Sequence, residues 1–205
     1  MFDVLNELNK VAPCYIKGGA VRDAIMGRTP RDYDFVFVGD VEQIKEKLSE
    51  SYTAVWQYSK LNIIGFAKTG EKYEACVVDD IENIGQRCDY TMNALLMDCN
   101  GNYRGNPGWV IDAKLKNLKM VSKDNLLSDP IRAIRGIRLR HSHCLAVEDE
   151  TMDVITSILP KIVIGDNQKQ FTISRRRMRK EIKKCSPEAK AELVSLGLIV
   201  PERWM

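Results

Sequence analysis

The stretch KGGAVRDAIMGRTPRDYDFVF, residues 17–37, joins a glycine pair to two acidic residues that are separated by one position. Asp32 and Asp34 lie at the start of an apolar run that is typical of a buried strand. Alternate residues of a strand point to the same face, so we expect these carboxylates side by side. A divalent cation offsets their repulsion, and oxygen ligands suit Mg²⁺. The alternative is a solvated pair of aspartates at the end of a strand.

The glycine pair, Gly18 and Gly19, lies where a short strand runs into a predicted helix. Glycines at such a turn allow backbone N–H groups to approach a phosphate. Arg22 follows closely and is expected to add a charge-assisted contact. A plain tight turn is the alternative for the glycines alone. Together with the carboxylate pair, however, they predict a nucleoside triphosphate site.

The composition is that of an ordinary soluble protein. The 205 residues are 44% hydrophobic and 29% charged, and no run of 18 apolar residues suggests a membrane span. The N-terminal residues lack the apolar core of a signal peptide. Six cysteines are scattered without a CxxC pair, which argues against a zinc site or a disulfide framework. These features favour a cytoplasmic protein without membrane contact.

Charge is distributed unevenly along the chain. Residues 1–121 carry a net charge of −2, and residues 122–205 carry +5. A basic C-terminal part suggests a polyanionic partner, although a solvated basic surface explains the same charge.

The pattern of elements changes at about the same place. Strand signals alternate with helix signals before residue 120, and only helix signals follow. We therefore expect two domains, residues 1–121 and residues 122–205, with an α+β fold in the first and helices in the second. The expected strands are 14–18, 33–39, 53–58, 62–68 and 72–78, and the expected helices are 3–10, 20–27, 41–50, 129–143, 148–162, 173–184 and 186–197.

Four segments, in order, resemble one family. GGAVRD…GRTPRDYDF resembles the signature of the class II tRNA nucleotidyltransferases and bacterial poly(A) polymerases, which belong to the DNA polymerase β superfamily. QRCDYTMNAL, SDPIRAIRGIRLR and ISRRRMRKEI resemble three further motifs of that family. The resemblance implies a nucleotidyltransferase palm, a small mixed sheet flanked by helices, followed by a helical neck.

The resemblance also implies an activity. We expect an Mg²⁺-dependent enzyme that adds CMP or AMP, from CTP or ATP, to the 3′ end of tRNA or a tRNA-like RNA and releases pyrophosphate. It would use no nucleic-acid template. Two alternatives stay open: a poly(A) polymerase-like or toxin-like nucleotidyltransferase, and a relative that binds nucleotide or RNA without catalysis.

Roles in the first part of the chain follow from the matched motifs. Asp32 and Asp34 resemble the metal ligands, and Glu74 on a predicted strand is the candidate third carboxylate, which would orient or deprotonate the 3′-hydroxyl. The structural alternative for Glu74 is a glutamate on an edge strand. For the Arg87 motif it is a salt bridge at the start of a helix. The expected nucleotide-binding residues of this part are Gly18, Gly19, Arg22, Arg31, Arg87, Asp89 and Asn93.

The second part supplies a base-reading helix and a basic helix. In DPIRAIRGIRLR, arginines and isoleucines each recur every three residues, which gives adjacent basic and apolar stripes on a helix. The resemblance implies that Asp129 and Arg132 read the base edge and that Arg135 and Arg138 support the phosphates. An amphipathic surface helix is the alternative. The expected RNA-binding residues on the following basic helix are Arg175, Arg176, Arg179, Lys180 and Lys183.

The chain departs from the family pattern at several points. Cys88 takes the place of the second arginine of the R-R-D motif, and Asp79 that of an arginine after the third carboxylate. Only 12 residues separate Glu74 from Arg87, where CCA-adding relatives have a longer loop that is needed for the switch from C to A addition. We further expect the body and tail domains of the family to be absent.

Overall fold

The computed structural model describes residues 2–58, 62–68, 70–165 and 170–204. The chain forms two compact units, and each draws on separate stretches of sequence. Residues 1–86 and 92–111 make the first unit, and residues 87–91 and 112–205 make the second.

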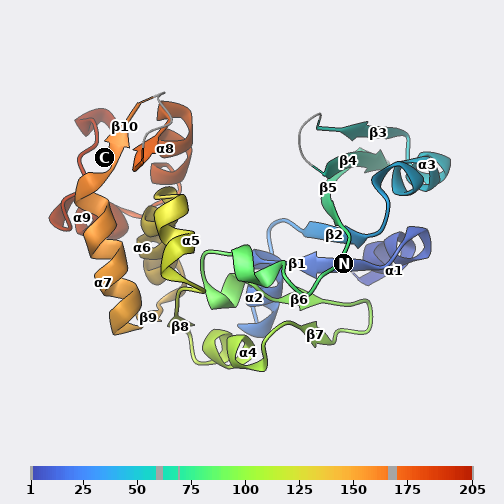
Figure 1. The fold of residues 1–205 in the computed structure, drawn as a ribbon, viewed down its shortest axis with the longest axis horizontal. Helices are drawn as coiled ribbons and strands as arrows, with labels where there is room; N and C mark the ends of the chain where they lie inside the picture. Colours follow the sequence, from blue (N-terminus) through green and yellow to red (C-terminus); the bar gives the residue numbers. More distant parts are fainter. Residues whose placement is uncertain (1, 59–61, 69, 166–169, 205) are drawn as a thin grey trace. The chain divides into compact units, whose positions relative to one another are not determined.

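The first unit is built on a seven-stranded mixed sheet (Figure 1), as the α+β prediction required. The strand order is β3-β4-β5-β2-β1-β6-β7. Among these pairs, β2 and β5 are parallel and the others are antiparallel. The strands are β1 (Cys14–Lys17), β2 (Asp34–Val38), β3 (Ala54–Gln57), β4 (Ile63–Lys68), β5 (Glu71–Val78), β6 (Leu96–Met97) and β7 (Tyr103–Arg104).

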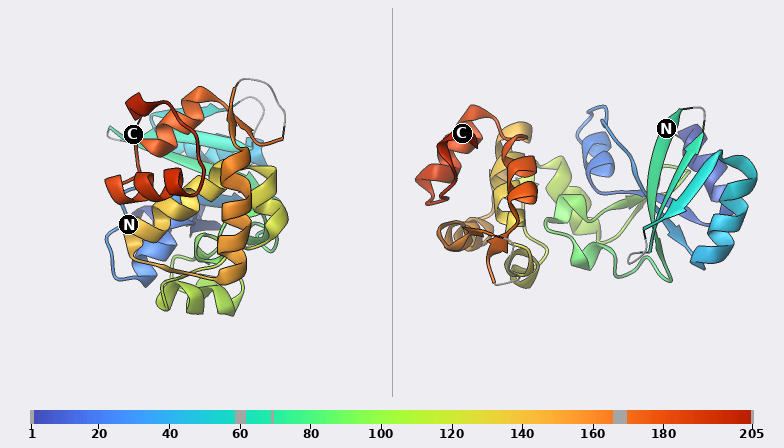
Figure 2. Two further views of the ribbon diagram at one scale, coloured as in Figure 1. Left: turned by 90° about the vertical axis from the view of Figure 1, so that its left-hand side faces the viewer. Right: turned by 90° about the horizontal axis from the view of Figure 1, so that it is seen from above.

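Two helices cover one face of this sheet. Figures 1 and 2 show α1 (Phe2–Val11) beside α3 (Val41–Ser51), with α2 (Gly19–Ile25) on the other side of the sheet. Leu8 of α1 and Leu48 of α3 are fully buried together with Phe35, Phe37 and Phe66 of the strands. This apolar face holds the sheet, so polar side chains on the opposite face need not contribute to the core.

The end of the first unit holds a helix that the sequence did not reveal. The sequence of residues 99–109, CNGNYRGNPGW, is rich in turn-forming residues, but α4 (Pro107–Lys114) begins within it. Pro107 suits the first position of a helix because its missing N–H has no partner there in any case. The Trp109 ring packs against Gly85, where an added Cβ would lie 2.3 Å from Cζ3.

The second unit is a helical cluster around α6 (Ile131–His143), which packs against four other helices. Ile131, Ile134 and Ile137 form the buried stripe predicted for this helix. Ser174 and Ser186 cap the N-termini of two partner helices by accepting backbone hydrogen bonds. The partners are α5 (Lys123–Ser128), α7 (Asp149–Ile158), α8 (Arg175–Ile182) and α9 (Pro187–Ser195), and the 3₁₀ turns of this unit include η3 (Leu159–Lys161) and η4 (Glu202–Trp204).

The expectation of helices alone in the second part was wrong. Two small parallel ladders occur there, and they pair β8 (Asn117–Leu118) with β9 (Ala146–Val147) and β10 (Val163–Ile164) with β11 (Thr172–Ile173). Each strand has two residues, too few for an alternating pattern to be recognised.

The units also divide the sequence differently from the expected boundary near residue 122. Residues 112–121 belong to the second unit, because β8 pairs with β9 and the Val121 N–H donates to the Asp89 carbonyl. Residues 87–91 join them, since the Thr91 N–H donates to the Lys119 carbonyl. These contacts are formed between distant segments, which local sequence signals do not report.

No helix in the described part of the chain is long and apolar enough to cross a membrane. All six cysteines are free thiols, as the absence of paired spacings predicted.

Gly136→Ala tests the packing of α6 against Tyr90. A Cβ at Gly136 would lie 2.1 Å from the hydroxyl oxygen of the fully buried Tyr90 and 2.8 Å from Ile155 Cδ1. We expect the substitution to lower the free energy of unfolding by about 1–3 kcal/mol, although alanine favours a helix. Urea unfolding followed by circular dichroism measures this. Tyr90→Phe in the same chain should restore part of the loss, and additive effects of the two changes would contradict the assignment.

Candidate functional site

The acidic residues of the opening stretch lie on the exposed face of the first unit's sheet. Asp34 starts β2 and is in register with Glu74 of β5 on one side and Lys17 of β1 on the other. Residues in register share a face, so these three side chains form a row across adjacent strands. Asp32 lies two residues before Asp34, and all three carboxylates reach solvent.

The pKa of Asp34 reflects both its burial and the charges around it. Partial desolvation raises the pKa of Asp34, and the charges of Asp32 and Glu74 raise it further, while Lys17 opposes them. Lys17 Nζ also lies 3.2 Å from Cys76 Sγ. Among the described residues, no three His, Cys, Asp or Glu side chains form a ready-made metal cage. The oxygen donors and their mutual repulsion nevertheless fit a hard divalent cation.

Tyr58 contributes to this row, and sequence reasoning missed it. Its hydroxyl donates to Glu74 Oε1 over 2.8 Å, from a residue that follows the edge strand β3. No local signal pointed to Tyr58, because the contact depends on the register of β3, β4 and β5. The hydrogen bond limits the rotation of the Glu74 side chain.

The glycine pair forms the predicted turn between β1 and α2. Gly18 has φ +69° and ψ −128°, a conformation that other residues rarely adopt, and its N–H donates to the Leu95 carbonyl. Arg22 is buried, and its guanidinium contacts Asp23 at 2.7 Å and donates to Asn93 Oδ1 at 2.8 Å. The structure therefore brings the predicted residues Arg22 and Asn93 together as a link that supports the turn.

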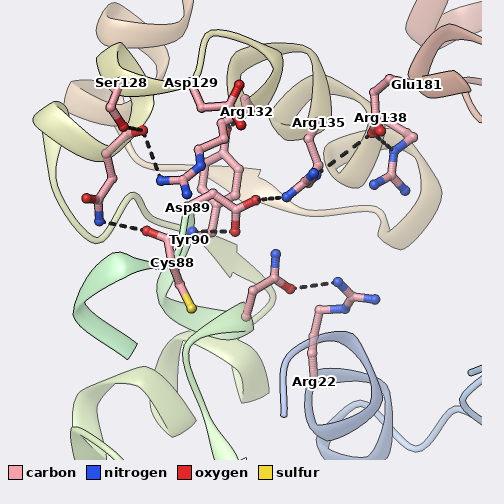
Figure 3. Close-up of polar contacts among 12 residues, drawn as sticks. Arg22, Cys88, Asp89, Tyr90, Ser128, Asp129, Arg132, Arg135, Arg138 and Glu181 are labelled. Atoms are coloured by element: carbon pink, nitrogen blue, oxygen red, sulfur yellow. Dashed lines mark hydrogen bonds and ion pairs between the residues drawn. The ribbon is translucent and has the colours of Figure 1, made fainter. Parts of the chain in front are cut away.

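Four predicted or motif residues form an ion-pair network in the second unit (Figure 3). Arg135 Nη1 lies 2.6 Å from Asp89 Oδ2, and Arg138 Nε lies 2.6 Å from Glu181 Oε1. Arg135 Nε is 4.0 Å from the same Glu181 oxygen. Asp89 and Glu181 are both buried, so these arginines neutralise carboxylates inside the unit.

Asp129 pairs with a residue that we had not singled out. Its Oδ2 lies 2.7 Å from Arg177 Nη2, while the predicted partner Arg132 donates to the Asn125 carbonyl at 3.0 Å. Asp129 and Arg177 line an open pocket of about 740 Å³ that also includes Phe171. Arg177 and Glu181 both belong to the motif ISRRRMRKEI, so the sequence marked this segment as functional. It did not indicate which residues the two would pair with.

The five predicted RNA-binding residues all line one pocket of the second unit. It has a volume of about 950 Å³ and gathers basic side chains from α8, α9 and the C-terminal residues. Sequence reasoning missed the contributions of Lys190, Arg203 and Trp204, which come from later segments. Ile182 also lines it, and the other lining residues are Arg175, Arg176, Arg179, Lys180 and Lys183.

Two predicted nucleotide-binding residues have exposed side chains. Arg31 precedes Asp32 in the first unit, and Arg87 begins the segment of the second unit that contains Asp89. Cys88, which departs from the family motif, is held in position through its backbone. Its carbonyl accepts a hydrogen bond from Asn125 Nδ2 at 2.8 Å.

Comparison with known proteins supports the resemblance. Residues 14–79 match the sequence profile of the poly(A) polymerase head domain. This range contains the glycine pair and the row of carboxylates. This segment of the chain is therefore similar to a poly(A) polymerase head domain.

Curated relatives extend the similarity beyond this head domain. A multifunctional CCA protein of Shewanella denitrificans is 32% identical over 165 residues, which cover 70% of this chain and 39% of that protein. A CC-adding tRNA nucleotidyltransferase of Synechocystis is 28% identical over 152 residues, which cover 71% of this chain and 36% of that protein. The chain is thus related to the CCA-adding enzymes and spans well under half the length of these relatives.

Solved structures agree with the fold. The Thermotoga maritima CCA-adding enzyme in complex with tRNA matches 95% of this chain and 50% of its own, with a TM-score of 0.80 and 21% identity. The Bacillus stearothermophilus CCA-adding enzyme in complex with CTP matches with a TM-score of 0.77 and 23% identity. At this identity the match establishes the fold: a palm-type head followed by a helical neck.

Removing Asp89 tests the ion-pair network. Asp89→Ala leaves Arg135 with Glu181 at 4.0 Å as its nearest carboxylate partner. We expect a loss of about 2 kcal/mol in the free energy of unfolding, because a partly buried charge loses its hydrogen-bonded partner. Chemical denaturation measures it. The control Asp153→Ala, at an exposed position of α7, should change stability by less than about 0.5 kcal/mol. Equal losses in both variants would show that the pair contributes nothing.

Proposed function

We propose that the protein is an RNA 3′-nucleotidyltransferase that adds nucleotides, from CTP or ATP, to the acceptor end of tRNA or a tRNA-like RNA. The observation that carries this proposal is the row of Asp34 and Glu74, with Asp32 beside it, on the exposed face of a matching head domain. Paired carboxylates at this position are needed for phosphoryl-transfer chemistry, whereas a protein that only binds nucleotide has little need of them.

The chain's own residues divide the chemistry between them. Asp32 and Asp34 supply the carboxylate oxygens that hold Mg²⁺, which neutralises charge on the triphosphate and activates the hydroxyl when bound. Glu74 accepts the proton of the RNA 3′-hydroxyl as its oxygen attacks the α-phosphate, and pyrophosphate leaves. The turn at Gly18 and Gly19, where the Gly18 N–H already donates to the Leu95 carbonyl, contacts the triphosphate, and Arg22 and Asn93 hold that turn in place.

The second unit supplies recognition in this proposal. Asp129 lies at the start of α6 and offers acceptor oxygens to the base edge, with Arg132 as the donor on the same helix. Arg135 and Arg138 keep α6 in place through their carboxylate partners and supply positive charge that would support the phosphates of the nucleotide. The other proposed nucleotide contacts are Arg31, Arg87 and Asp89.

One feature favours C addition over A addition. The segment between Glu74 and Arg87 has 12 residues and leaves no room for the longer loop expected for the switch to A. We therefore propose that CMP is transferred more efficiently than AMP.

The carboxylates are tested by isosteric replacement. Asp32→Asn, Asp34→Asn and Glu74→Gln should each reduce transfer at least a hundredfold, a loss of about 2.7 kcal/mol of transition-state stabilisation, with little change in melting temperature. The assay combines Mg²⁺, a tRNA that lacks its CCA end, and each nucleoside triphosphate separately. Glu71→Gln on the same strand as Glu74 should retain full activity. Failure of the wild type to extend any RNA would refute the function itself.

RNA binding through the basic pocket is tested by salt dependence. Lys183→Ala should weaken binding of an acceptor-stem RNA and reduce the slope of log K against log salt by about one, because one phosphate contact is lost. Lys184→Ala is the matched control, since Lys184 is exposed on the same segment but does not line the pocket. Fluorescence anisotropy at several salt concentrations gives both slopes. The same slope for the two variants would place the RNA elsewhere.

A further inference from the structure

Two aromatic residues lie next to the row of carboxylates at one edge of the sheet. Trp56 of β3 is in register with Gly65 of β4, and Gly65 is in register with Glu74. Glu74 is in register with Asp34, so Trp56 shares the exposed face with both carboxylates. Tyr58 follows two positions after Trp56 and reaches Glu74 through its hydroxyl.

Gly65 determines how Trp56 lies. A Cβ at Gly65 would be 2.0 Å from Trp56 Cε2, so the indole occupies the space that a side chain would take and lies against the sheet. Such packing covers the glycine of β4, the strand next to the edge, and accounts for one face of the ring. Trp56 nevertheless stays half-buried, with part of the indole open to solvent.

Core packing does not explain Tyr58. The aromatic cluster of this unit lies on the other face, where Phe66 is buried and stacks on Tyr73 with ring centroids 5.5 Å apart. Tyr58 is 43% exposed, although its hydroxyl is fixed on Glu74. A tyrosine ring held beside a carboxylate and open to water is a suitable surface for stacking a nucleobase.

The position of Trp56 and Tyr58 along the row indicates which nucleobase they would contact. The row runs from Lys17, next to the glycine turn of the triphosphate, through Asp34 to Glu74 and then to Trp56. Glu74 is the proposed acceptor of the proton from the attacking hydroxyl. The nucleotide that bears this hydroxyl therefore lies on the aromatic side of Glu74, away from the triphosphate.

We propose that Trp56 and Tyr58 form a stacking site for the 3′-terminal nucleobase of the RNA substrate. The inference rests on the proposed function, because it requires that Glu74 receive an RNA 3′-hydroxyl. Through its hydrogen bond to Glu74, Tyr58 also positions that side chain. One residue therefore both stacks on the terminal base and orients the carboxylate.

The test compares two acceptor-stem RNAs that differ only in the final nucleotide, which carries either adenine or no base on an intact ribose. Binding is measured by fluorescence anisotropy without nucleotide or Mg²⁺, so the result does not depend on catalysis. Wild-type protein should bind the RNA with the base about tenfold more tightly. Tyr58→Ala and Trp56→Leu should remove this preference and leave affinity for the abasic RNA unchanged.

Tyr103→Ala is the matched control, because Tyr103 is 40% exposed on β7 at the opposite edge of the sheet. It should keep the full preference. If Trp56→Leu lowers the melting temperature, Tyr58→Ala decides the question, since its exposed ring is not part of the core. Wild-type binding without preference for the base, or equal weakening of both RNAs by Tyr58→Ala, would overturn the stacking site while leaving the transferase proposal intact. No binding of either RNA would refute both.

Discussion

The parallel pairing of β2 with β5 places Asp34 directly beside Glu74, and the repulsion between these carboxylates is the constraint on which the first unit depends. Strand β2, which carries Asp34, cannot move away from Glu74. Phe35, Val36 and Phe37 follow at once and are almost completely buried. The buried side chains that follow Asp34 thus fix β2 beside β5, and partial desolvation, together with the neighbouring charges of Asp32 and Glu74, raises the pKa of Asp34. In the proposed function this arrangement suits a cation, because folding has already brought the carboxylates together.

In the second unit, the arginines lie on α6, which is also the helix against which the other helices pack. α6 buries its isoleucines and turns Arg135 and Arg138 toward Asp89 and Glu181, both of which are buried. These pairs gain little stability over apolar packing, but they fix the rotation of the helix. Asp129, just before α6, therefore has a defined position, which its proposed contact with the base requires. The basic side chains that line the large pocket lie instead on α8, α9 and η4, where charge is exposed.

Features that depend on residues adjacent in sequence could be predicted. Features that depend on pairing between distant segments could not. The strand of Asp34, the strand of Glu74 and the helix of the isoleucine stripe have local patterns, and all three are confirmed. The register that adds Tyr58 to Glu74 requires three strands to align, and no local pattern encodes it. Likewise Arg135 was expected to support the nucleotide phosphates or to lie on an amphipathic surface, and its ion pair with Asp89, 46 residues away, was not foreseen. The two-residue strands of the second unit left no pattern at all.

The way the sequence is shared between the units follows from the same dependence on pairing. Residues 87–91 lie between segments of the first unit, yet Asp89 binds Arg135 and the Tyr90 hydroxyl donates to the Arg132 carbonyl, both in the second. Tyr90 is fully buried there, against Gly136. The motif QRCDYTMNAL therefore passes from the first unit into the second and back again, with Asn93 bound to Arg22 of the first. A short motif that contributes side chains to both units thus links the glycine turn to α6 through the covalent chain itself, and many of the proposed nucleotide contacts lie within it.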